Sequence, residues 1–494
     1  MEGNDRQKID VFKNNKLLLG GSIAAIIALI IIVAVLLPRT EERSDGKSDI
    51  EGNGNMDTVE TPSESGENDV GTGQQGNEDI MLLKEFVSPF DSHNISAEFM
   101  AEMDGADYVL LGESSHGTVE YYRIRADITK KLIADKGFSF VAVEGDWPNI
   151  YHVNRYVKGY GGDAAGSGKD VLLDAVRWPE WMWANSEFLE LVEWLRDYNK
   201  GLPKEEKVGL YGVDMQDMSA SISKSVTALK DIDAELANVV AKEYDELEPL
   251  ADDFIKYAQA YAHGDANSER EVRRALIAFN DRFERVSVFA SPQLFNIKQN
   301  MLAVQYGETY SRAMVAGGSL SWNVRCNYMK RTVMNLGEHY GSGSKGIVWA
   351  HNTHVGDARA TSMIDDGRVN IGQLLREEFG EDKVYLVGLG SYRGEVKAGL
   401  EWGIQGEVMG LPPAIPGSAE YMLAKADKPS FLILFSREEE IPGFLTEPIG
   451  HRAKGVVYNP LNDEGYYVPT IMSLRYDAFI FIEETTALRY LQGG

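Results

Sequence analysis

The chain has 494 residues, of which 44% are hydrophobic and 25% charged, and this composition excludes a wholly disordered or fibrous protein. Its 76 acidic residues outnumber the 49 basic ones and give a net charge of −27, so the chain lacks the basic excess on which nucleic-acid binding depends. The single cysteine, Cys326, excludes intrachain disulfides and cysteine-based zinc sites, and we expect it to be a small buried residue.

The N-terminal segment predicts a membrane anchor. Residues 17–37 form an uncharged apolar run, long enough as a helix to span about 30 Å of hydrocarbon. Four basic residues precede this run, so residues 1–16 are expected to be a cytoplasmic stub and the rest of the chain to be extracellular. The competing interpretation is a cleaved signal peptide, whose apolar core is usually shorter and is followed by a small-residue cleavage site.

Residues 38–79 have the composition of a flexible tether. They contain twelve acidic and three basic residues, no aromatic residue, and many glycines, serines and asparagines. Such a segment cannot bury enough apolar surface to offset the entropy of ordering. We therefore expect a disordered acidic spacer between the anchor and the folded part.

Residues 80–494 predict one α/β domain. Short apolar runs rich in β-branched and aromatic residues alternate there with amphipathic helical patterns, which favours a mixed, largely parallel sheet flanked by helices. Residues 218–340 show helical periodicity almost throughout and predict a helical insertion. The predicted strands are Tyr108–Leu111, Phe138–Val143, Val208–Val213, Gly346–Ala350, Val384–Leu389, Phe431–Phe435 and Ala478–Ile482.

Ionisable side chains follow four of these strands. In an open α/β sheet, ligands bind beyond the carboxyl ends of the strands, so the groups at these four ends are expected to share one cleft. The candidates, in chain order, are Glu113, His116, Glu144, Asp146, Asp214, His351 and His354.

Arg125 gives an independent indication of the same site. It lies on the apolar stripe of the helix predicted after His116, and a buried arginine needs a carboxylate partner. Glu113 and Glu144 are the candidate partners, since both come after neighbouring strands. The stripe itself consists of Tyr121, Ile124, Ile128 and Leu132.

Two hydrolytic mechanisms fit this set of residues. His116 can act as a general base on water, while a second histidine or Arg125 stabilises the developing oxyanion. Alternatively, carboxylate and imidazole ligands suit zinc or manganese and would make a metal-dependent hydrolase of another bond type. That metal site would consist of Glu113, His116, Glu144 and His351.

Other classes of function have weaker support. The chain contains neither the G-x-S-x-G elbow of serine hydrolases nor the H-E-x-x-H helix of metalloproteases. Ser114 and Ser115 are near His116 but lack an elbow around them. A surface binding domain with a degenerate site is a third hypothesis, although a binding module would not need so many ionisable groups.

The motifs around these residues resemble those of the erythromycin esterase family. They include Leu111-Gly112-Glu113-Ser114-Ser115-His116-Gly117, Tyr122-Arg123-Ile124-Arg125, Val143-Glu144-Gly145-Asp146-Trp147, Trp181-Met182-Trp183-Ala184-Asn185, Tyr211-Gly212-Val213-Asp214 and Trp349-Ala350-His351-Asn352-Thr353-His354. The resemblance covers roughly residues 80–490 and implies a mixed α/β core with a cleft at the strand ends.

The resemblance also implies an activity and roles for the residues. The family hydrolyses the lactone ester of macrolide antibiotics, with a histidine that activates water and without a required metal. By motif position, the catalytic group would be His116, Glu113, Glu144, Arg125 and His351, and the substrate-binding group would be His354, Asp146, Trp147, Asp214 and Trp183. One departure is Cys326, which comes after Arg325 where the family has an acidic residue.

Overall fold

The computed structural model describes residues 74–160, 166–175, 177–436 and 440–491. The predicted anchor at 17–37 and most of the predicted tether lie outside these ranges. Within them, no helix is both long and apolar enough to cross a membrane. Helix α4 (Gln74–Phe86) begins inside the segment that we predicted as tether.

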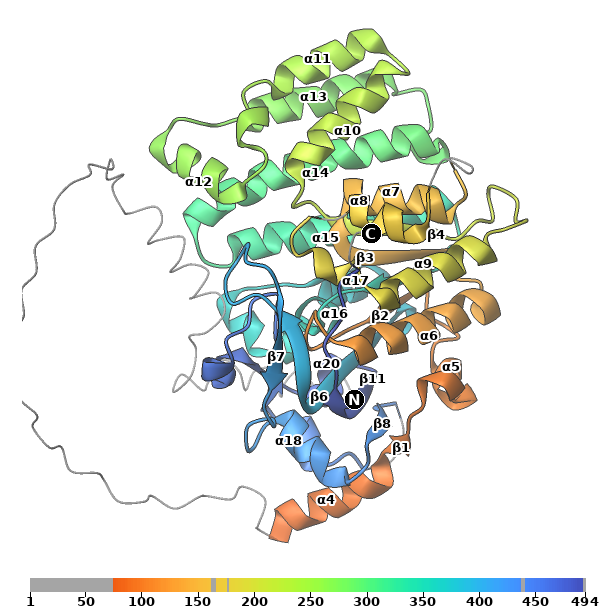
Figure 1. Cartoon of the computed structure of the whole chain (residues 1–494), viewed down its shortest axis with the longest axis vertical. Helices are drawn as coiled ribbons and strands as arrows, with labels where there is room; N and C mark the ends of the chain where they lie inside the picture. Colours follow the sequence, from red (N-terminus) through yellow and green to blue (C-terminus); the bar gives the residue numbers. More distant parts are fainter. Residues whose placement is uncertain (1–73, 161–165, 176, 437–439, 492–494) are drawn as a thin grey trace, which may run out of the picture.

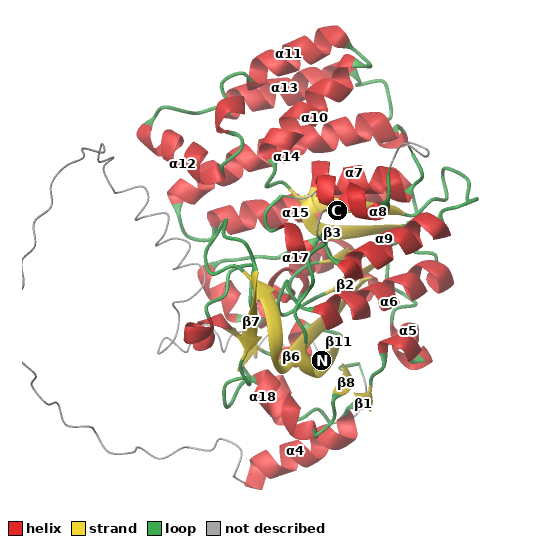
Figure 2. Ribbon diagram, in the orientation of Figure 1, coloured by secondary structure: helices red, strands yellow, loops and turns green. Residues whose placement is uncertain are grey.

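A nine-stranded sheet forms the centre of the protein (Figure 2). The six strands from β11 to β4 are parallel to one another, whereas β8, β1 and β7 pair antiparallel with the strands beside them. The predicted mixed, largely parallel sheet is therefore confirmed. In spatial order the strands are β1 (Ser88–Pro89), β8 (Ser430–Leu434), β11 (Ala478–Thr485), β6 (Val384–Ala398), β2 (Tyr108–Leu111), β5 (Gly346–Trp349), β3 (Phe140–Asp146) and β4 (Gly209–Asp214), and β7 (Glu407–Leu411) pairs with the end of β6.

Three strands are longer than their apolar runs predicted, and β11 is one of them because it continues to Thr485 instead of ending at Ile482. β3 continues to Asp146, so Glu144 lies within the strand instead of after it. β6 continues to Ala398, because its second half pairs with β11 and then with β7 while one face is exposed to solvent. An apolar run detects only strands that are buried on both faces. For the same reason the small sheet of β9 (Ile449–Arg452) and β10 (Tyr467–Thr470) was not predicted.

Helices cover both faces of the sheet. On β2, Val109 and Leu111 pack with the buried side chains of α6 (Val119–Lys136) and α9 (Ser186–Tyr198). The alternate residues Tyr108 and Leu110 pack with α15 (Leu320–Tyr340) and α17 (Ile371–Phe379) on the opposite face. The remaining short helices are α5 (Ala97–Glu102), α7 (Trp147–Val157), α8 (Gly168–Ala175), α16 (Asn352–Val355), α18 (Ala419–Leu423), α19 (Gly443–Thr446) and α20 (Met472–Arg475).

Every regular element between β4 and β5 is a helix, as the periodicity of this segment predicted. Its first five helices gather at one end of the protein, at the top of Figure 1, and share a hydrophobic cluster of their own. The sixth, α15, packs against the sheet through Met329, Val333 and Leu336. The five helices are α10 (Met218–Lys230), α11 (Ala234–Tyr244), α12 (Phe254–His263), α13 (Glu269–Arg282) and α14 (Pro292–Ala316).

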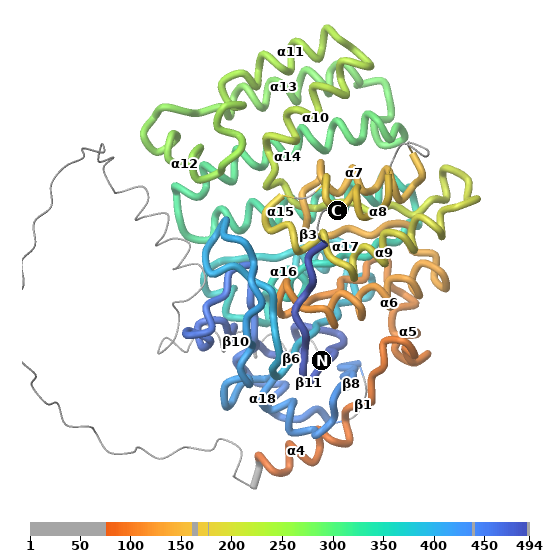
Figure 3. Tube along the Cα trace, in the orientation of Figure 1, coloured from red at the N-terminus to blue at the C-terminus, as the bar shows by residue number. Residues whose placement is uncertain are grey.

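Strand register brings the carboxyl ends of four strands to one level. Trp349 of β5 lies between Leu111 of β2 and Val143 of β3, and Val143 in turn lies beside Gly212 of β4. The groups just beyond these residues are therefore neighbours at one edge of the sheet. The last described segment runs back from β11 past this region and pairs Tyr490 with Asn185 (Figure 3).

Candidate active site

A cavity of about 620 Å³ opens at this edge of the sheet. Seven of the predicted site residues line it, and three do not: Glu113 and Arg125 lie behind its wall, and Trp147 is part of the core. The seven are His116, Glu144, Asp146, Trp183, Asp214, His351 and His354.

The loop after β2 is shaped by two glycines. A Cβ at Gly112 would lie 2.1 Å from Oδ1 of Asn352, and a Cβ at Gly117 would lie 1.9 Å from the carbonyl oxygen of Lys397. Any other residue at either position would clash with these atoms. The two close approaches fix both ends of the loop that carries Glu113 and His116.

Glu113 joins His116 to Arg125. Its Oε1 lies 2.9 Å from Nδ1 of His116, and its Oε2 accepts a hydrogen bond of 2.6 Å from Nη2 of Arg125. The Arg125 guanidinium lies between the rings of Tyr122 and Trp349, 4.6 Å from each ring centroid. The prediction that Arg125 faces the core and pairs with a carboxylate is confirmed. Its expected contact with an oxyanion is wrong, because the side chain is fully buried behind Glu113.

This arrangement sets the tautomer of His116. A carboxylate can only accept, so Nδ1 carries the proton and Nε2 is left as the acceptor. Nε2 makes no hydrogen bond to any described residue. Burial lowers the pKa of His116, but the carboxylates of Glu144 and Glu113 outweigh that effect and raise the pKa above its usual value. A neutral His116 is therefore a base with a strengthened affinity for a proton.

His351 has the opposite arrangement. Its Nδ1 accepts a hydrogen bond from the backbone N–H of Thr353 and lies 2.8 Å from the Thr353 hydroxyl, so the ring proton is on Nε2. Burial and the neighbouring His116 hold the pKa of His351 well below its usual range, so the ring is neutral. A contact with the backbone of Ser114 acts in the opposite direction and raises the pKa of His351, but by less than burial lowers it. Nε2–H consequently remains a buried donor without a partner among the described residues.

The two histidine rings face the same space. Their centroids are 5.0 Å apart, and both side chains line the cavity. One ring offers an unprotonated nitrogen and the other an N–H donor. A substrate group placed against both rings would meet a proton acceptor and a hydrogen-bond donor together.

Arg325 of α15 is a central residue that sequence reasoning missed. Its Nη2 donates to Glu144 at 2.8 Å and to Asp214 at 2.6 Å, and its Nη1 lies 3.1 Å from Nε2 of His354. It lies three and four residues before the buried Tyr328 and Met329, which is the spacing of one helix face. The same helical pattern would therefore have found it.

Glu144 is held as a charged group by several neighbours. Burial raises its pKa, but the His354 and His116 rings and the Arg325 guanidinium together hold the pKa well below its usual range. Burial lowers the pKa of His354 itself, whose Nε2 lies 3.3 Å from Oε1 of Glu144. Arg325 is always charged, and we therefore regard it as the partner that keeps Glu144 ionised. The second oxygen of Glu144 accepts the backbone N–H of His351 at 2.8 Å.

His354 is occupied at both ring nitrogens. Nε2 accepts from Arg325, and Nδ1 lies 3.5 Å from Sγ of Cys326. The ring stacks on Trp322, with 4.5 Å between centroids. Burial raises the pKa of Cys326 strongly, which keeps it a thiol and agrees with its expected role as a small buried residue. Of the two histidines after β5, only His351 has a ring nitrogen without a hydrogen-bond partner among the described residues.

Asp146 and Trp147 have different surroundings. Asp146 accepts from Nε of Arg177 at 2.9 Å, and burial with the nearby Asp214 raises its pKa to about 6 in spite of Arg177. Trp147 is fully buried and stacks on Tyr211, with 5.5 Å between centroids. The expectation that Trp147 contacts substrate is therefore wrong: it is the first residue of α7 and points into the core.

The serine and metal alternatives can be compared with this geometry. The hydroxyls of Ser114 and Ser115 pair with Tyr121 and Thr118, and neither bonds to His116. Within the described residues, no group of three or more histidine, cysteine and acidic side chains has the arrangement of a metal site. Both oxygens of Glu113, a proposed ligand, are already engaged by His116 and Arg125.

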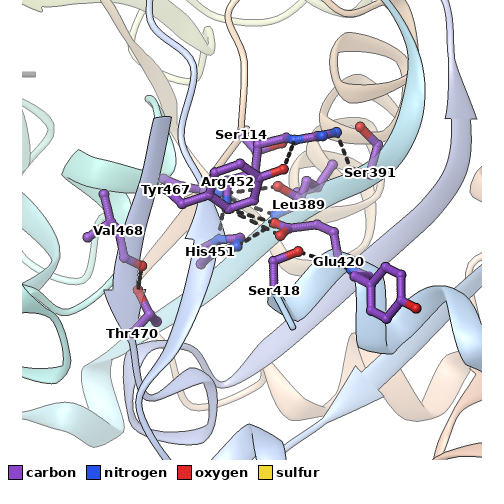
Figure 4. A network of polar contacts seen from close by, with 12 residues as sticks. Ser114, Leu389, Ser391, Ser418, Glu420, His451, Arg452, Tyr467, Val468 and Thr470 are labelled. Atoms are coloured by element: carbon purple, nitrogen blue, oxygen red, sulfur yellow. Dashed lines mark hydrogen bonds and ion pairs between the residues drawn. The ribbon is translucent and has the colours of Figure 1, made fainter. Parts of the chain in front are cut away.

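A second network of buried polar groups includes Glu420 and His451 and lies near Ser114 of the loop after β2 (Figure 4). The buried His451 bonds through Nδ1 to Glu420 at 2.6 Å, and its Nε2 lies 3.3 Å from Nδ2 of Asn352. The backbone N–H of Asn352 donates to the carbonyl of Glu113 at 2.8 Å. This network thereby ties the loop after β5 to the loop after β2.

Comparisons with known proteins agree with this fold. The chain is 23% identical over 310 residues to an erythromycin esterase type II of Escherichia coli, covering 59% of this chain and 70% of that protein. A succinoglycan biosynthesis protein has a similar crystal structure, with a TM-score of 0.69, 18% identity, and coverage of 84% of this chain and 98% of that one. A mutant erythromycin esterase, EreC, in an open conformation gives a TM-score of 0.57 with 17% identity, over 80% and 95% of the two chains.

The family assignment follows from the extent of the sequence match. The pattern of the erythromycin esterase family matches residues 133–485, which include the whole sheet apart from β1 and β2. That range contains Glu144, Arg325 and His351. The loop with Glu113 and His116 precedes it and lies against the same cavity. The chain thus belongs to the erythromycin esterase family.

Proposed function

We propose that this protein hydrolyses a carboxylic ester or lactone by direct attack of water. The proposal depends on two histidine rings whose centroids are 5.0 Å apart. Nε2 of His116 can accept a proton, because Nδ1 carries the ring proton, and Nε2 of His351 carries the ring proton and can donate a hydrogen bond. In this mechanism, Nε2 of His116 takes a proton from water, and the hydroxide adds to the carbonyl carbon. Nε2–H of His351 stabilises the oxyanion. The imidazolium then returns its proton to the leaving alkoxide.

Macrolide lactones are the first substrates to test. The similar erythromycin esterase supports that choice, and a cavity of about 620 Å³ is of the size that binds drug-sized ligands. We would incubate the full-length chain with a panel of 4-nitrophenyl esters and macrolides and follow product release. No turnover on any of them would favour the alternative, a surface binding domain.

We also propose that residues 17–37 anchor the enzyme in the cell membrane and that its catalytic domain is extracellular. The support is the length of the uncharged run and the basic residues before it. Protease treatment of intact cells tests this topology. Survival of the domain in intact cells and its loss after lysis would contradict it.

Replacing His351 should lower kcat more than it changes KM. The H351A variant loses the oxyanion donor, and we expect a loss of about 100-fold in kcat. The H351Q variant keeps an N–H donor and should recover part of the rate. Steady-state kinetics of the three proteins on one ester check this, and a loss confined to KM would contradict an oxyanion role.

The value of kcat/KM should rise with pH, and the midpoint of this rise should lie above pH 6.5. The base must be neutral, so the rate rises as pH passes the pKa of His116, which the Glu144 and Glu113 carboxylates raise above its usual value. The E113Q variant removes one of these charges and should shift the midpoint to lower pH. The measurement is kcat/KM between pH 5 and 9, and an unshifted midpoint in E113Q would contradict this assignment.

Chelation should leave the activity unchanged. The His116 mechanism needs no metal, and Glu113 already has both oxygens occupied by His116 and Arg125. The check is kcat/KM before and after dialysis against EDTA, with metal analysis of the purified protein. Loss of activity that zinc or manganese restores would instead favour the metal-dependent hydrolase.

A further inference from the structure

The turn between β6 and β7 carries an exposed apolar patch. Leu400, Trp402 and Ile404 have exposed fractions of 53%, 57% and 50%. Three large apolar side chains exposed together on one turn differ from the scattered apolar residues of an ordinary surface, and such patches mark sites of binding. We call these three residues, together with Trp178, the lip.

The lip is continuous with the catalytic cavity. Trp178 and Trp402 both line the cavity that contains His116 and His351. Their rings pack edge to face with 4.5 Å between centroids, and Nε1 of Trp178 donates to the carbonyl of Ile404 at 2.8 Å. Two segments more than 220 residues apart therefore build one aromatic surface at the edge of the cavity.

Backbone hydrogen bonds hold the turn in place. The N–H of Gly399 donates to Val456 at 2.9 Å, and the carbonyl of Gly399 accepts from Tyr458 at 3.0 Å. Within the turn, the N–H of Ile404 donates to Glu401 at 3.3 Å. A surface that is ordered before binding loses little conformational entropy when a ligand arrives. The lip is thus prepared to receive an apolar group.

We propose that the lip selects esters with a bulky apolar part and holds that part while the ester group lies against His116 and His351. This inference rests on the proposed function. The inner wall of the cavity carries Glu144, Asp146, Asp214 and Arg325, so a ligand that fills the cavity meets charge inside and aromatic rings at the edge. An amphipathic ester, with polar groups on one part and an apolar body on another, matches this distribution of charged and aromatic side chains.

The lip is better suited to bind the substrate than to bind a lipid surface. Two of the four lip residues form part of the cavity wall, which a flat bilayer would not reach. The chain also carries a net charge of −27, which opposes contact with anionic lipid headgroups. Both observations favour a molecule that enters the cavity.

The experiment compares two esters with the same leaving group, 4-nitrophenyl acetate and 4-nitrophenyl octanoate, on the full-length chain. In the W402A variant, the ratio of kcat/KM for octanoate to that for acetate should fall about tenfold, mainly through KM for octanoate. The matched control is V408A, since Val408 is 57% exposed on β7 but does not line the cavity. That variant should keep the wild-type ratio.

Two results would overturn the proposal. They are an unchanged ratio in W402A, which weaker retention of that variant on phosphatidylcholine vesicles would assign to a lipid surface, and an equal loss on both esters. If the wild type hydrolyses neither these two esters nor any macrolide of the panel, the proposed function has failed, and the lip is tested separately by calorimetry with octanamide. The W402A variant should then bind octanamide about tenfold more weakly, and equal affinity would overturn the lip as a binding surface.

Discussion

The H116A variant should lose about 1,000-fold in kcat/KM for any ester that the protein hydrolyses, because general-base assistance contributes about that much. The ring is the one group in the described cavity wall whose free nitrogen accepts a proton and whose other nitrogen is fixed by a carboxylate. No other side chain of that described wall is placed to substitute for it. Steady-state hydrolysis of 4-nitrophenyl acetate checks this loss.

The structure should survive this substitution. His116 lies on a loop that Gly112 and Gly117 already confine, and its side chain makes one hydrogen bond, to Glu113. We therefore expect H116A to keep the near-UV circular dichroism of the wild type. The matched control is H93A, because His93 is an exposed histidine that does not line the cavity. A wild-type rate in H116A, or an equal loss in H93A, would exclude His116 as the base.

The second large effect concerns stability. The R325A variant should lower the free energy of unfolding by about 3 kcal/mol, because it leaves two buried carboxylates without their charged partner. Those carboxylates, Glu144 and Asp214, have side chains that are 4% and 6% exposed. Activity should fall as well, since Glu144 also holds the backbone N–H of His351. Urea denaturation of the wild type and the variant gives the difference in free energy.

A surface arginine is the control for R325A. Arg393 pairs with Glu483 and Glu484, and all three side chains are more than 40% exposed. Exposed ion pairs contribute little, so R393A should change the free energy of unfolding by less than about 1 kcal/mol. The R325K variant keeps the positive charge but not the forked geometry of the guanidinium. Its change in the free energy of unfolding should therefore lie between those of R325A and R393A. Equal effects of R325A and R393A would refute the argument from burial.

The sequence was informative about the strands and about the polar residues at their carboxyl ends. β2 has the bounds that its apolar run predicted, β5 ends one residue earlier, and β4 and β8 are each shifted by one residue at both ends. A strand buried on both faces is visible in its own residues, because every side chain in it must be apolar. The end of β3 was less visible, since Glu144 and Asp146 are polar residues inside the strand.

The sequence was less informative about which charged side chains form pairs. The apolar stripe showed that Arg125 needs a carboxylate, but Glu113 and Glu144 were equal candidates until the loop after β2 was placed. Arg325 was not chosen as a site residue, because its partners come from segments far from it in the sequence. Its three partners come from β3, β4 and α16.

By itself, the sequence determined the fold class, the edge of the sheet where the site lies, and His116 as the candidate base. These depend on patterns within a few residues, such as a run of apolar side chains or a motif after a strand. Only the tertiary structure decided which carboxylate Arg125 meets, which nitrogen of His351 is free, and that Trp178 meets Trp402. Those outcomes depend on distances between groups far apart in the chain, and such distances are fixed only when the whole core is packed.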